Sequence, residues 1–316
     1  MKKFKIYRMP GNSGNVIVSH AVGGNYLKNW ENNSLDTWLY YCEKHDLGLL
    51  ILTELILDDG KKIHWQKLLL GNELKKLEIG IINACYLDTD IIINPGATNI
   101  FEGYNQKKVG LVSQYKNLPY NRLAVLRKLA FFRHNYYSKN YPLDSSLFFS
   151  AKETYKYHDL RPYDDYACMG VFLINLKNHA NFLYKLFQKY NHGIKSLDGG
   201  SEEVYLNYEI ISNNLVQWLP YKWQSLWIFE MPWCHSHLYF NANKSSILNS
   251  IKSSLFNCNF LHFAGTWEGI HWNECENLLK NLKIDDYLQF EKYLKIKLTR
   301  KPQGINHRPK NENTKV

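Results

Sequence analysis

Two aspartates interrupt an apolar run in the first third of the chain. In CYLDTDIIINPGATNIFEG, which begins at Cys85, Asp88 and Asp90 stand one residue apart between apolar stretches. Side chains of a strand alternate between faces, so both carboxylates would emerge on the same side. Two like charges this close repel unless something neutralises them. Water at a turn, a lysine or a divalent cation could do so, and Mg²⁺ and Mn²⁺ prefer such oxygen ligands.

The composition is that of a globular protein. The chain has 316 residues, of which 45% are hydrophobic and 22% charged, which suits one large domain or two ordinary ones. Six scattered cysteines without a C-x-x-C pair favour reduced core residues of a cytoplasmic protein. The N-terminus lacks the apolar region of a signal peptide, and the longest apolar stretch, from Leu47, is too short to span a bilayer.

The formal net charge of +10 is concentrated at the C-terminus. Eight Lys and Arg and one Glu occur between Lys292 and Val316. We predict an N-terminal extension over 1–14, a single domain over 15–290 and a basic, disordered tail over 291–316. The tail is either solvated or a peripheral contact to anionic lipid or glycan. Specific nucleic-acid binding is not expected, because aromatic residues are not interleaved with the basic ones.

Strand and helix patterns alternate along the first hundred residues. Apolar runs predict strands over 16–19, 47–55 and 79–93, and helical spacing predicts helices after Ser34 and over 67–77. Such alternation favours a parallel sheet with right-handed crossovers. Further helices are predicted over 121–132, 176–190, 201–212 and 273–296, and further strands over 168–175, 216–227 and 256–265. We expect one α/β domain with a mostly parallel central sheet flanked by helices and a less regular C-terminal half.

Four further segments are informative because of the order in which they and the two aspartates occur along the chain. They are SHAVGGNYL from Ser19, MGVFLINL from Met169, SEEVYLNYEI from Ser201, and LP at Leu219 followed by HFAG at His262. Together they resemble the motifs of nucleotide-sugar glycosyltransferases with the GT-A (Rossmann-like) fold, closest to glycosyltransferase family eight and its relatives. The likeness spans roughly residues 16–272. It implies a divalent metal and a nucleoside-diphosphate sugar, with a UDP-sugar as the first choice of donor.

The same resemblance assigns a metal site. It implies that Asp88, Asp90 and His262 are the ligands, whereas spacing alone makes His262 a core or turn histidine. A neutral imidazole beside two carboxylates suits Mn²⁺ better than Mg²⁺.

Donor contacts and catalytic groups are implied in the same way. The resemblance places the donor against the two aspartates and four other residues, namely His20, Ala21, Tyr26 and Lys67. It places Glu202 and Glu203 near the reactive face of the sugar as catalytic residues. Simpler readings are a solvated helix lysine for Lys67 and a helix start favoured by the dipole for the two glutamates.

Weaker candidates lie in the second half of the chain. Asp164 and Asp165 are either hydroxyl contacts or a surface turn, and Asn175 is expected near the acceptor or the donor sugar. His235 and His237 share one face of a predicted strand near Cys234 in WCHSHLYF, but they lack a fourth ligand at zinc-site spacing and are attributed to chance.

One departure from the family pattern concerns charge. Glu268, in TWEGIHW, stands near the place where the family has a lysine for the diphosphate. We expect a metal-dependent enzyme that moves a hexose to a glycan or lipid-linked acceptor, with retention favoured by the resemblance. The missing lysine motivates the alternative, a degenerate relative that binds nucleotide or glycan without turnover. A sugar-phosphate nucleotidyltransferase would need a Gly- and Arg-rich phosphate loop, which SHAVGGNYLKNW does not supply.

Overall fold

The structure is a computed structural model that describes residues 3–137, 146–190, 201–265, 267–276 and 278. The predicted basic tail and most of the predicted helix over 273–296 therefore lie outside the described residues. Within the described ranges, no helix is both long enough and apolar enough to cross a bilayer.

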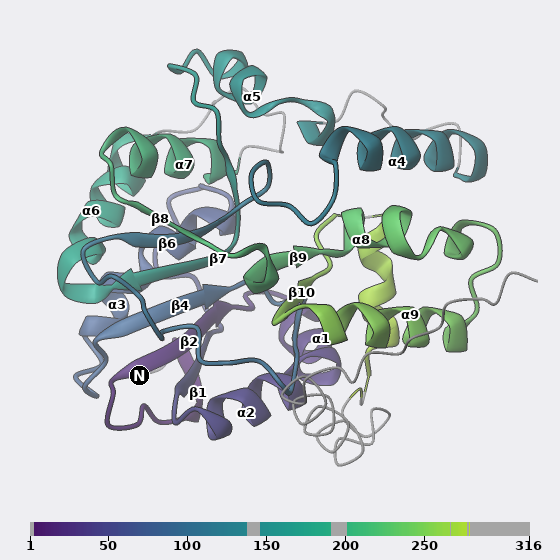
Figure 1. The fold of residues 1–316 in the computed structure, drawn as a ribbon. Helices are drawn as coiled ribbons and strands as arrows, with labels where there is room; N and C mark the ends of the chain where they lie inside the picture. Colours follow the sequence, from purple (N-terminus) through teal and green to yellow (C-terminus); the bar gives the residue numbers. More distant parts are fainter. Residues whose placement is uncertain (1–2, 138–145, 191–200, 266, 277, 279–316) are drawn as a thin grey trace, which may run out of the picture.

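A seven-stranded sheet forms the centre of the molecule, with the strand order β1-β3-β2-β4-β7-β6-β8 (Figure 1). The strands are β1 (Phe4–Arg8), β2 (Asn15–His20), β3 (Gly48–Leu52), β4 (Asn83–Leu87), β6 (Val109–Ser113), β7 (Ala167–Asn175) and β8 (Val216–Leu219). The first three predicted strands are parallel neighbours, as expected. The sheet as a whole is mixed, because β7 runs antiparallel to both β4 and β6.

Residues of the predicted N-terminal extension belong to this sheet. Strand β1 pairs antiparallel with β3 and forms one edge.

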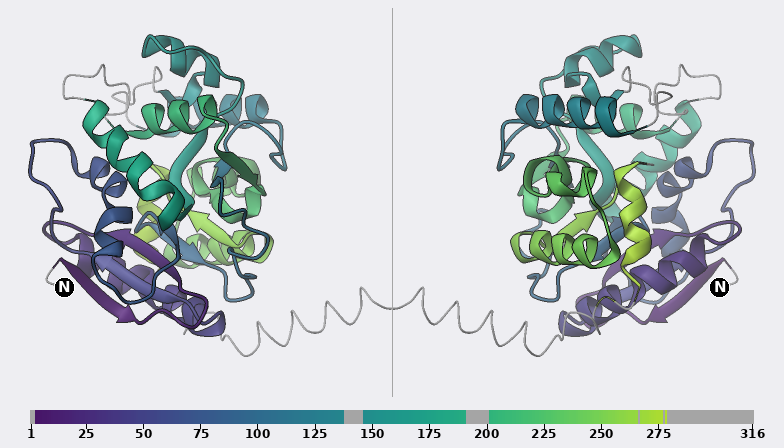
Figure 2. Two further views of the ribbon diagram at one scale, coloured as in Figure 1. Left: turned by 90° about the vertical axis from the view of Figure 1, so that its left-hand side faces the viewer. Right: turned by 90° about the vertical axis from the view of Figure 1, so that its right-hand side faces the viewer.

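Helices cover both faces of the sheet (Figure 2). They include α1 (Tyr26–Asn33), α2 (Leu35–Lys44), the 3-10 helix η1 (Ile63–Leu68), α3 (Leu70–Lys75), α6 (Leu176–Lys189) and α7 (Glu203–Ser212). Alternating strand residues divide between two cores: Val16 and Val18 pack with α3, α6 and α7, whereas Ile17 packs with α1 and α2. This alternation is the period of two that a sheet imposes. The mixed α/β fold with flanking helices is thus confirmed.

A second, smaller sheet lies beside the first, with the order β5-β10-β9. Its strands are β5 (Ile91–Ile93), β9 (Ser225–Leu226) and β10 (Phe260–His262). A third core joins this sheet to α4 (Arg122–Tyr136), α8 (Trp227–Cys234) and α9 (Lys244–Asn257). The remaining short elements are η2 (Ser146–Phe148), α5 (Ala151–Tyr157), η3 (Tyr221–Gln224), η4 (Ser236–Tyr239) and η5 (Glu268–Glu274). The predicted strand at 233–240 is wrong, since this segment is the end of α8 followed by η4.

The segment that contains the two aspartates joins the two sheets. The backbone N–H of Asp88 donates to Gly170 O at 2.8 Å, which continues the β4–β7 ladder. The carbonyl of Asp90 accepts from the N–H of Phe263 at 3.0 Å, which continues the β5–β10 ladder. The predicted continuous strand over 79–93 is therefore interrupted, because its two halves belong to different sheets. The aspartates lie in the turn between them.

A buried ion pair fixes the chain after β10. The Nε of Arg133, on α4, donates to Glu268 Oε1 at 2.8 Å, and its Nη2 pairs with Oε2. The hydroxyl of Tyr239 also donates to Oε1, at 3.0 Å. Glu268 is fully buried and Arg133 nearly so. Because each charge is removed from water, neither tolerates the loss of its partner.

We expect Glu268→Gln to lower the free energy of unfolding by about 3–5 kcal/mol, because it leaves the Arg133 guanidinium buried without a counter-charge. Urea unfolding of the purified protein measures this loss. Glu274→Gln is the matched control, since its 3.5 Å pair with Lys244 lies at the surface and should change stability by less than about 1 kcal/mol. Equal effects of the two substitutions would contradict the structural role of the buried pair.

Candidate functional site

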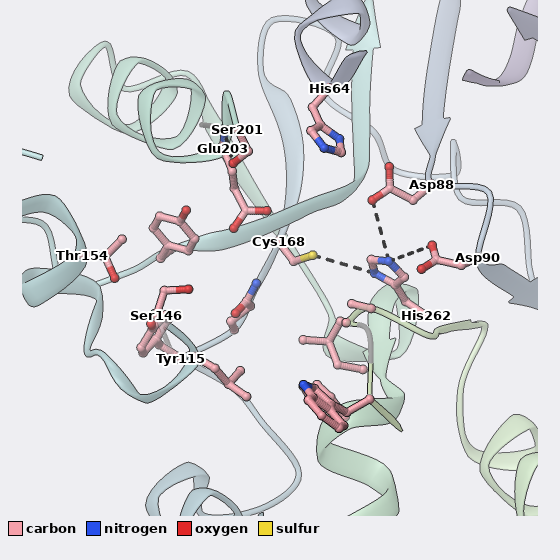
Figure 3. A pocket seen from close by; sticks show the side chains of 18 of the residues that line it. His64, Asp88, Asp90, Tyr115, Ser146, Thr154, Cys168, Ser201, Glu203 and His262 are labelled. Carbon is pink, nitrogen blue, oxygen red and sulfur yellow. Dashed lines mark hydrogen bonds and ion pairs between the residues drawn. The ribbon is translucent and has the colours of Figure 1, made fainter. Parts of the chain in front are cut away.

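Asp88, Asp90 and His262 converge at the junction of the two sheets. His262 ends β10, and its Nε2 lies 3.2 Å from Asp90 Oδ1 and 3.7 Å from Asp88 Oδ2. One oxygen of each carboxylate and a ring nitrogen of His262 all lie within 4.8 Å of one another. Figure 3 shows both aspartates pointing toward the same edge of the imidazole ring. The structure thus brings together three residues that are far apart in the sequence.

The carboxylate of Asp88 is oriented by its neighbours. The hydroxyl of Tyr86, two residues earlier, donates to Asp88 Oδ1 at 2.7 Å. Because this hydroxyl gives its proton to Asp88, it accepts from Nδ1 of His20 at 2.9 Å. The imidazole of His20 also stacks on the Tyr86 ring, and burial lowers the pKa of His20 to about 3. His20 is therefore a neutral donor at the end of β2.

Lys67 connects Asp88 to the start of α7. Its Nζ lies 2.9 Å from Glu202 Oε1 and 3.6 Å from Asp88 Oδ1, and it donates to Met169 O at 3.2 Å. Burial opposes the charge of this lysine, but Asp88 and Glu202 outweigh burial and raise its pKa above the ordinary value. Lys67 is thus a buried, permanently charged bridge and not a solvated helix lysine.

The pKa values in the triad follow from the short distances between its charged groups. Burial raises the pKa of Asp88, but Lys67 and then His262 outweigh burial and bring it to about 2. Burial alone would lower the pKa of His262, whereas the Asp90 carboxylate raises it well above its ordinary range. A positive charge between the two aspartates is therefore stabilised.

The two glutamates stand on the same wall at the start of α7. Glu202 is almost fully buried, and its Oε2 has no hydrogen-bond partner among the residues that the structure describes. Glu203 Oε2 accepts from the N–H of Met169 at 3.2 Å. Both glutamates line a cavity together with the triad.

The far side of the His262 ring packs against three residues from other elements. Gln224, at the end of η3, places its Nε2 3.0 Å from His262 Nδ1, and Cys168 Sγ lies 3.8 Å from the same nitrogen. A Cβ at Gly170 would come within 2.3 Å of His262 Cε1 and 2.8 Å of Gln224 Nε2. Glycine is therefore required at this point of β7 for the ring to reach the aspartates.

Two cavities meet at the triad. The larger, of about 620 Å³, extends toward α4, η2 and α7 and includes Tyr115, Arg122 and Trp267 in its lining. The smaller, of about 450 Å³, extends toward α1 and η5 and includes Tyr26 and Trp272. Asp88, Asp90, His64 and Gly265 line both cavities. In Figure 3, His64 points from η1 toward the space beside Asp88.

Other predicted residues lie in several environments. Tyr26 is exposed, and both Tyr26 and His20 line the smaller cavity. Ala21, in contrast, is buried in the core formed with α1 and α2. Asp164 is exposed and pairs with Lys152 at 2.7 Å. Asp165 is buried and accepts from Ser113 Oγ and from the N–H of Tyr166.

The prediction for Asn175 is wrong. Its side chain caps α6 by accepting from the N–H of Asn178. In the sheet it pairs with Asn83, at the beginning of β4. Asp88 follows the other end of that strand, so Asn175 and the triad lie at opposite ends of the strands.

Hydrogen bonds to α9 account for the two histidines of WCHSHLYF. His235 Nε2 lies 2.9 Å from Ser254 Oγ and His237 Nε2 lies 3.3 Å from Ser250 Oγ. Neither belongs to a cluster of three or more potential metal ligands in the described part of the chain. Each of the two histidines thus has a hydrogen-bond partner on α9.

Sequence reasoning missed Gln224, Gly170, His64 and Arg133. Gly170 stands inside the MGVFLINL segment, where a glycine in an apolar strand already signals a close approach. No local pattern marks the other three, since each reaches the site through the tertiary arrangement of its element.

Among solved structures, the chain is similar to several glycosyltransferases. One is involved in the glycosylation of the major capsid of PBCV-1, with 9% identity and a TM-score of 0.48 over 83% of this chain and 98% of that chain. The galactosyltransferase LgtC, in complex with donor and acceptor sugar analogs, has 11% identity and a TM-score of 0.41 over 83% and 94%. Mouse xyloside xylosyltransferase 1 has 12% identity and a TM-score of 0.38 over 81% and 99%.

No protein-family model and no curated protein matches the chain. The function therefore has to be argued from the residues of the site.

We expect Gly170→Ala to weaken Mn²⁺ binding by roughly tenfold or more, because the added methyl group displaces the His262 ring from the aspartates. Titration of Mn²⁺, followed by the electron paramagnetic resonance signal of the free ion, measures the affinity. Gly110→Ala is the control, since its Cβ would meet Leu173 in the same sheet at 3.1 Å without contact to the triad. Equal affinities in both variants would show that the ring does not depend on Gly170.

Proposed function

We propose that the chain is a metal-dependent glycosyltransferase that moves a hexose from a nucleoside-diphosphate sugar, UDP-sugar first, to a glycan or lipid-linked acceptor. The observation that carries the proposal is the position of the triad of Asp88, Asp90 and His262, between two cavities that both reach it. A donor whose diphosphate lies at the triad would extend its nucleoside into one cavity and its sugar into the other. The resemblance of the motifs favours retention of the anomeric configuration.

The residues present fit a divalent cation. Two carboxylates and one imidazole are the donor types that Mn²⁺ accepts. An ion bound at His262 Nε2 requires the proton on Nδ1, which then needs an acceptor. Gln224 Oε1 is buried and has no hydrogen-bond partner in the described part of the chain, and half a turn of the amide brings it to Nδ1. Gln224 thus provides the second interaction that metal-bound histidines almost always make.

The smaller cavity suits the nucleoside. The exposed ring of Tyr26 and the indole of Trp272 offer apolar surface for a base, and His20 offers a polar group at the cavity wall. Gly23 and Gly24 precede Tyr26 with φ values of 88° and 47°, so glycine lets the chain turn tightly between β2 and α1. A lining of apolar groups with a small number of polar ones is the usual composition of a small-molecule site.

The larger cavity suits the sugar and the acceptor. Glu202 Oε2, which has no partner within the described ranges, would accept from a sugar hydroxyl, and this removes the cost of a buried, unsatisfied oxygen. The Glu203 carboxylate stands beside it, held at one oxygen by the N–H of Met169. Negative charge on this wall stabilises the positive charge that develops on the sugar during transfer. When bound, the metal ion supplies Lewis acidity that stabilises the departing diphosphate.

The degenerate-binder alternative rested on the missing lysine, near whose expected place Glu268 stands. In the structure this carboxylate is fully buried and neutralised by Arg133, so it presents no net negative charge to a diphosphate. Arg133 itself lines the larger cavity. The missing lysine still motivates the alternative, but Glu268 adds no negative charge to it, and turnover remains the preferred function.

We expect UDP to bind the purified protein in the presence of Mn²⁺, and its affinity to fall at least 100-fold in Asp88→Ala/Asp90→Ala. Loss of a residue that only orients a metal ligand weakens metal binding by about 10- to 100-fold, and this variant loses two of the ligands themselves. Isothermal titration calorimetry with Mn²⁺ and then with EDTA measures both. Asp58→Ala/Asp59→Ala, outside both cavities, is the control. UDP binding that persists in EDTA would remove the metal from the proposal, and binding without hydrolysis of any UDP-sugar would favour the degenerate binder.

A second test isolates the orientation of His262. We expect Gln224→Leu to weaken Mn²⁺ binding by about 10- to 100-fold, because Nδ1–H then lacks an acceptor. Gln224→Glu should restore the affinity, since a carboxylate oxygen accepts the same proton. Mn²⁺ titrations of both variants, with circular dichroism to confirm folding, make the comparison. Equal loss in the two variants would indicate a packing role and not an orienting one.

A further inference from the structure

The outer side of α4, together with the adjoining ends of α8 and η4, carries exposed apolar and basic side chains in one place. This surface, called the α4 face below, consists of Leu123, Arg127, Lys128, Phe131, Tyr136, Trp233 and Phe240. Phe131 and Phe240 are each 58% exposed. Large exposed aromatics are ordinary when single, whereas a contiguous group marks a contact surface.

Several side chains of the α4 face contact one another or the ring of Phe132. Lys128 Nζ lies 4.6 Å above the ring of Trp233, and the rings of Tyr136 and Phe240 lie 4.7 Å apart. The buried ring of Phe132 contacts both Phe131 and Phe240, at 5.6 and 5.8 Å between centroids. The exposed ring of Phe131 is therefore connected through Phe132 to the exposed rings of Phe240 and Tyr136.

The charge of this region has one sign. No Asp or Glu occurs between Gly103 and Leu143, which includes α4, or between Met231 and Trp267, which includes the end of α8, η4 and α9. The basic side chains of Arg127 and Lys128 are exposed, as is His134. The one carboxylate on α4, α8 or η4 is Glu230, which is only partly exposed and accepts from the Tyr221 hydroxyl at 3.2 Å. A surface whose exposed side chains are rings, Leu and cations matches the interface of an anionic bilayer.

We propose that the α4 face docks peripherally on an anionic membrane surface. The rings of Phe131 and Phe240 enter the headgroup region, and Arg127 and Lys128 contact lipid phosphates. Burial of apolar area and attraction to anionic lipid act together, as in other interfacial helices. This inference does not depend on the proposed function.

Other occupants fit the α4 face less well. A second copy related by a two-fold axis would set the cations of one α4 face against those of the other, with no carboxylate among the residues of the face to pair with. A nucleic acid would use the cations and leave Leu123 and Phe240 without a corresponding apolar partner. The bilayer satisfies both kinds of side chain at once.

The α4 face lies next to the larger cavity. Arg122 and Arg133 of α4 and Ile228 of α8 line that cavity from the inner side of the same two helices. Docking would therefore hold the cavity about one helix diameter, roughly 10 Å, from the lipid surface. If the proposed transfer takes place there, an acceptor carried on a lipid is the one that this arrangement favours.

Vesicle co-sedimentation of the full chain tests the proposal. Vesicles of phosphatidylcholine alone are compared with vesicles of an equal mixture of phosphatidylcholine and phosphatidylglycerol. We expect binding to the mixed vesicles, about 30-fold weaker in Arg127→Gln/Lys128→Gln and roughly tenfold weaker in Leu123→Ser/Phe131→Ser. All substituted positions are exposed, and urea unfolding confirms that each variant is folded.

Matched controls come from α6, which lies at the opposite end of the molecule in Figure 1. Lys177→Gln/Lys185→Gln removes two exposed charges there, and Tyr184→Ser removes an exposed ring. Loss confined to the α4 variants supports the proposal. Absence of vesicle binding, or binding unchanged in the α4 variants, overturns it. Self-association that depends on Phe131, measured by analytical ultracentrifugation, likewise overturns it in favour of a contact between copies.

Discussion

The contact between His262 and the two aspartates is the constraint on which the rest of the structure depends. Asp88 completes the ladder of the large sheet and Asp90 that of the small one, so the carboxylates meet where the sheets meet. Their mutual repulsion would open this junction if no positive charge lay between them. The imidazole of His262, delivered by β10, answers that requirement in the protein alone, and the same arrangement of donors suits a divalent ion.

Several residues around the triad keep this junction in place. Tyr86 and Lys67 fix the Asp88 carboxylate from one side, and Gln224 and Gly170 define the position of the His262 ring from the other. They come from four different elements of the fold. A site so supported is held to a single geometry, because each support is buried and packed and has little freedom to relax.

The charges around the two cavities are distributed unequally. Carboxylates gather on the triad and on the wall at α7, whereas α4 brings guanidinium groups to the other wall. Arg133 is neutralised by Glu268, and Lys67 is shared between Asp88 and Glu202. A substrate with separated negative and positive character, such as a diphosphate joined to a sugar that becomes cationic, complements this distribution.

The sequence by itself determined much of the fold. Apolar runs marked β2, β3, β4 and β7, and helical spacing marked α4 and α6, whose N-caps in the structure are Asn121 and Asn175. These signals are local, since they depend on period and capping within a few residues. The D-x-D segment was equally visible, and resemblance of the motifs added His262.

Only the tertiary structure decided how these parts meet. It decided the direction of β7, the division of residues 79–93 between two sheets, and the pairing of Arg133 with Glu268. Each of these depends either on contacts between segments more than a hundred residues apart or on which sheet a strand joins. No local pattern encodes such contacts, because the burial that selects them exists only once the chain has folded. For the same reason Glu268 looked like an exposed substitution in the sequence and proved to be one half of a buried ion pair.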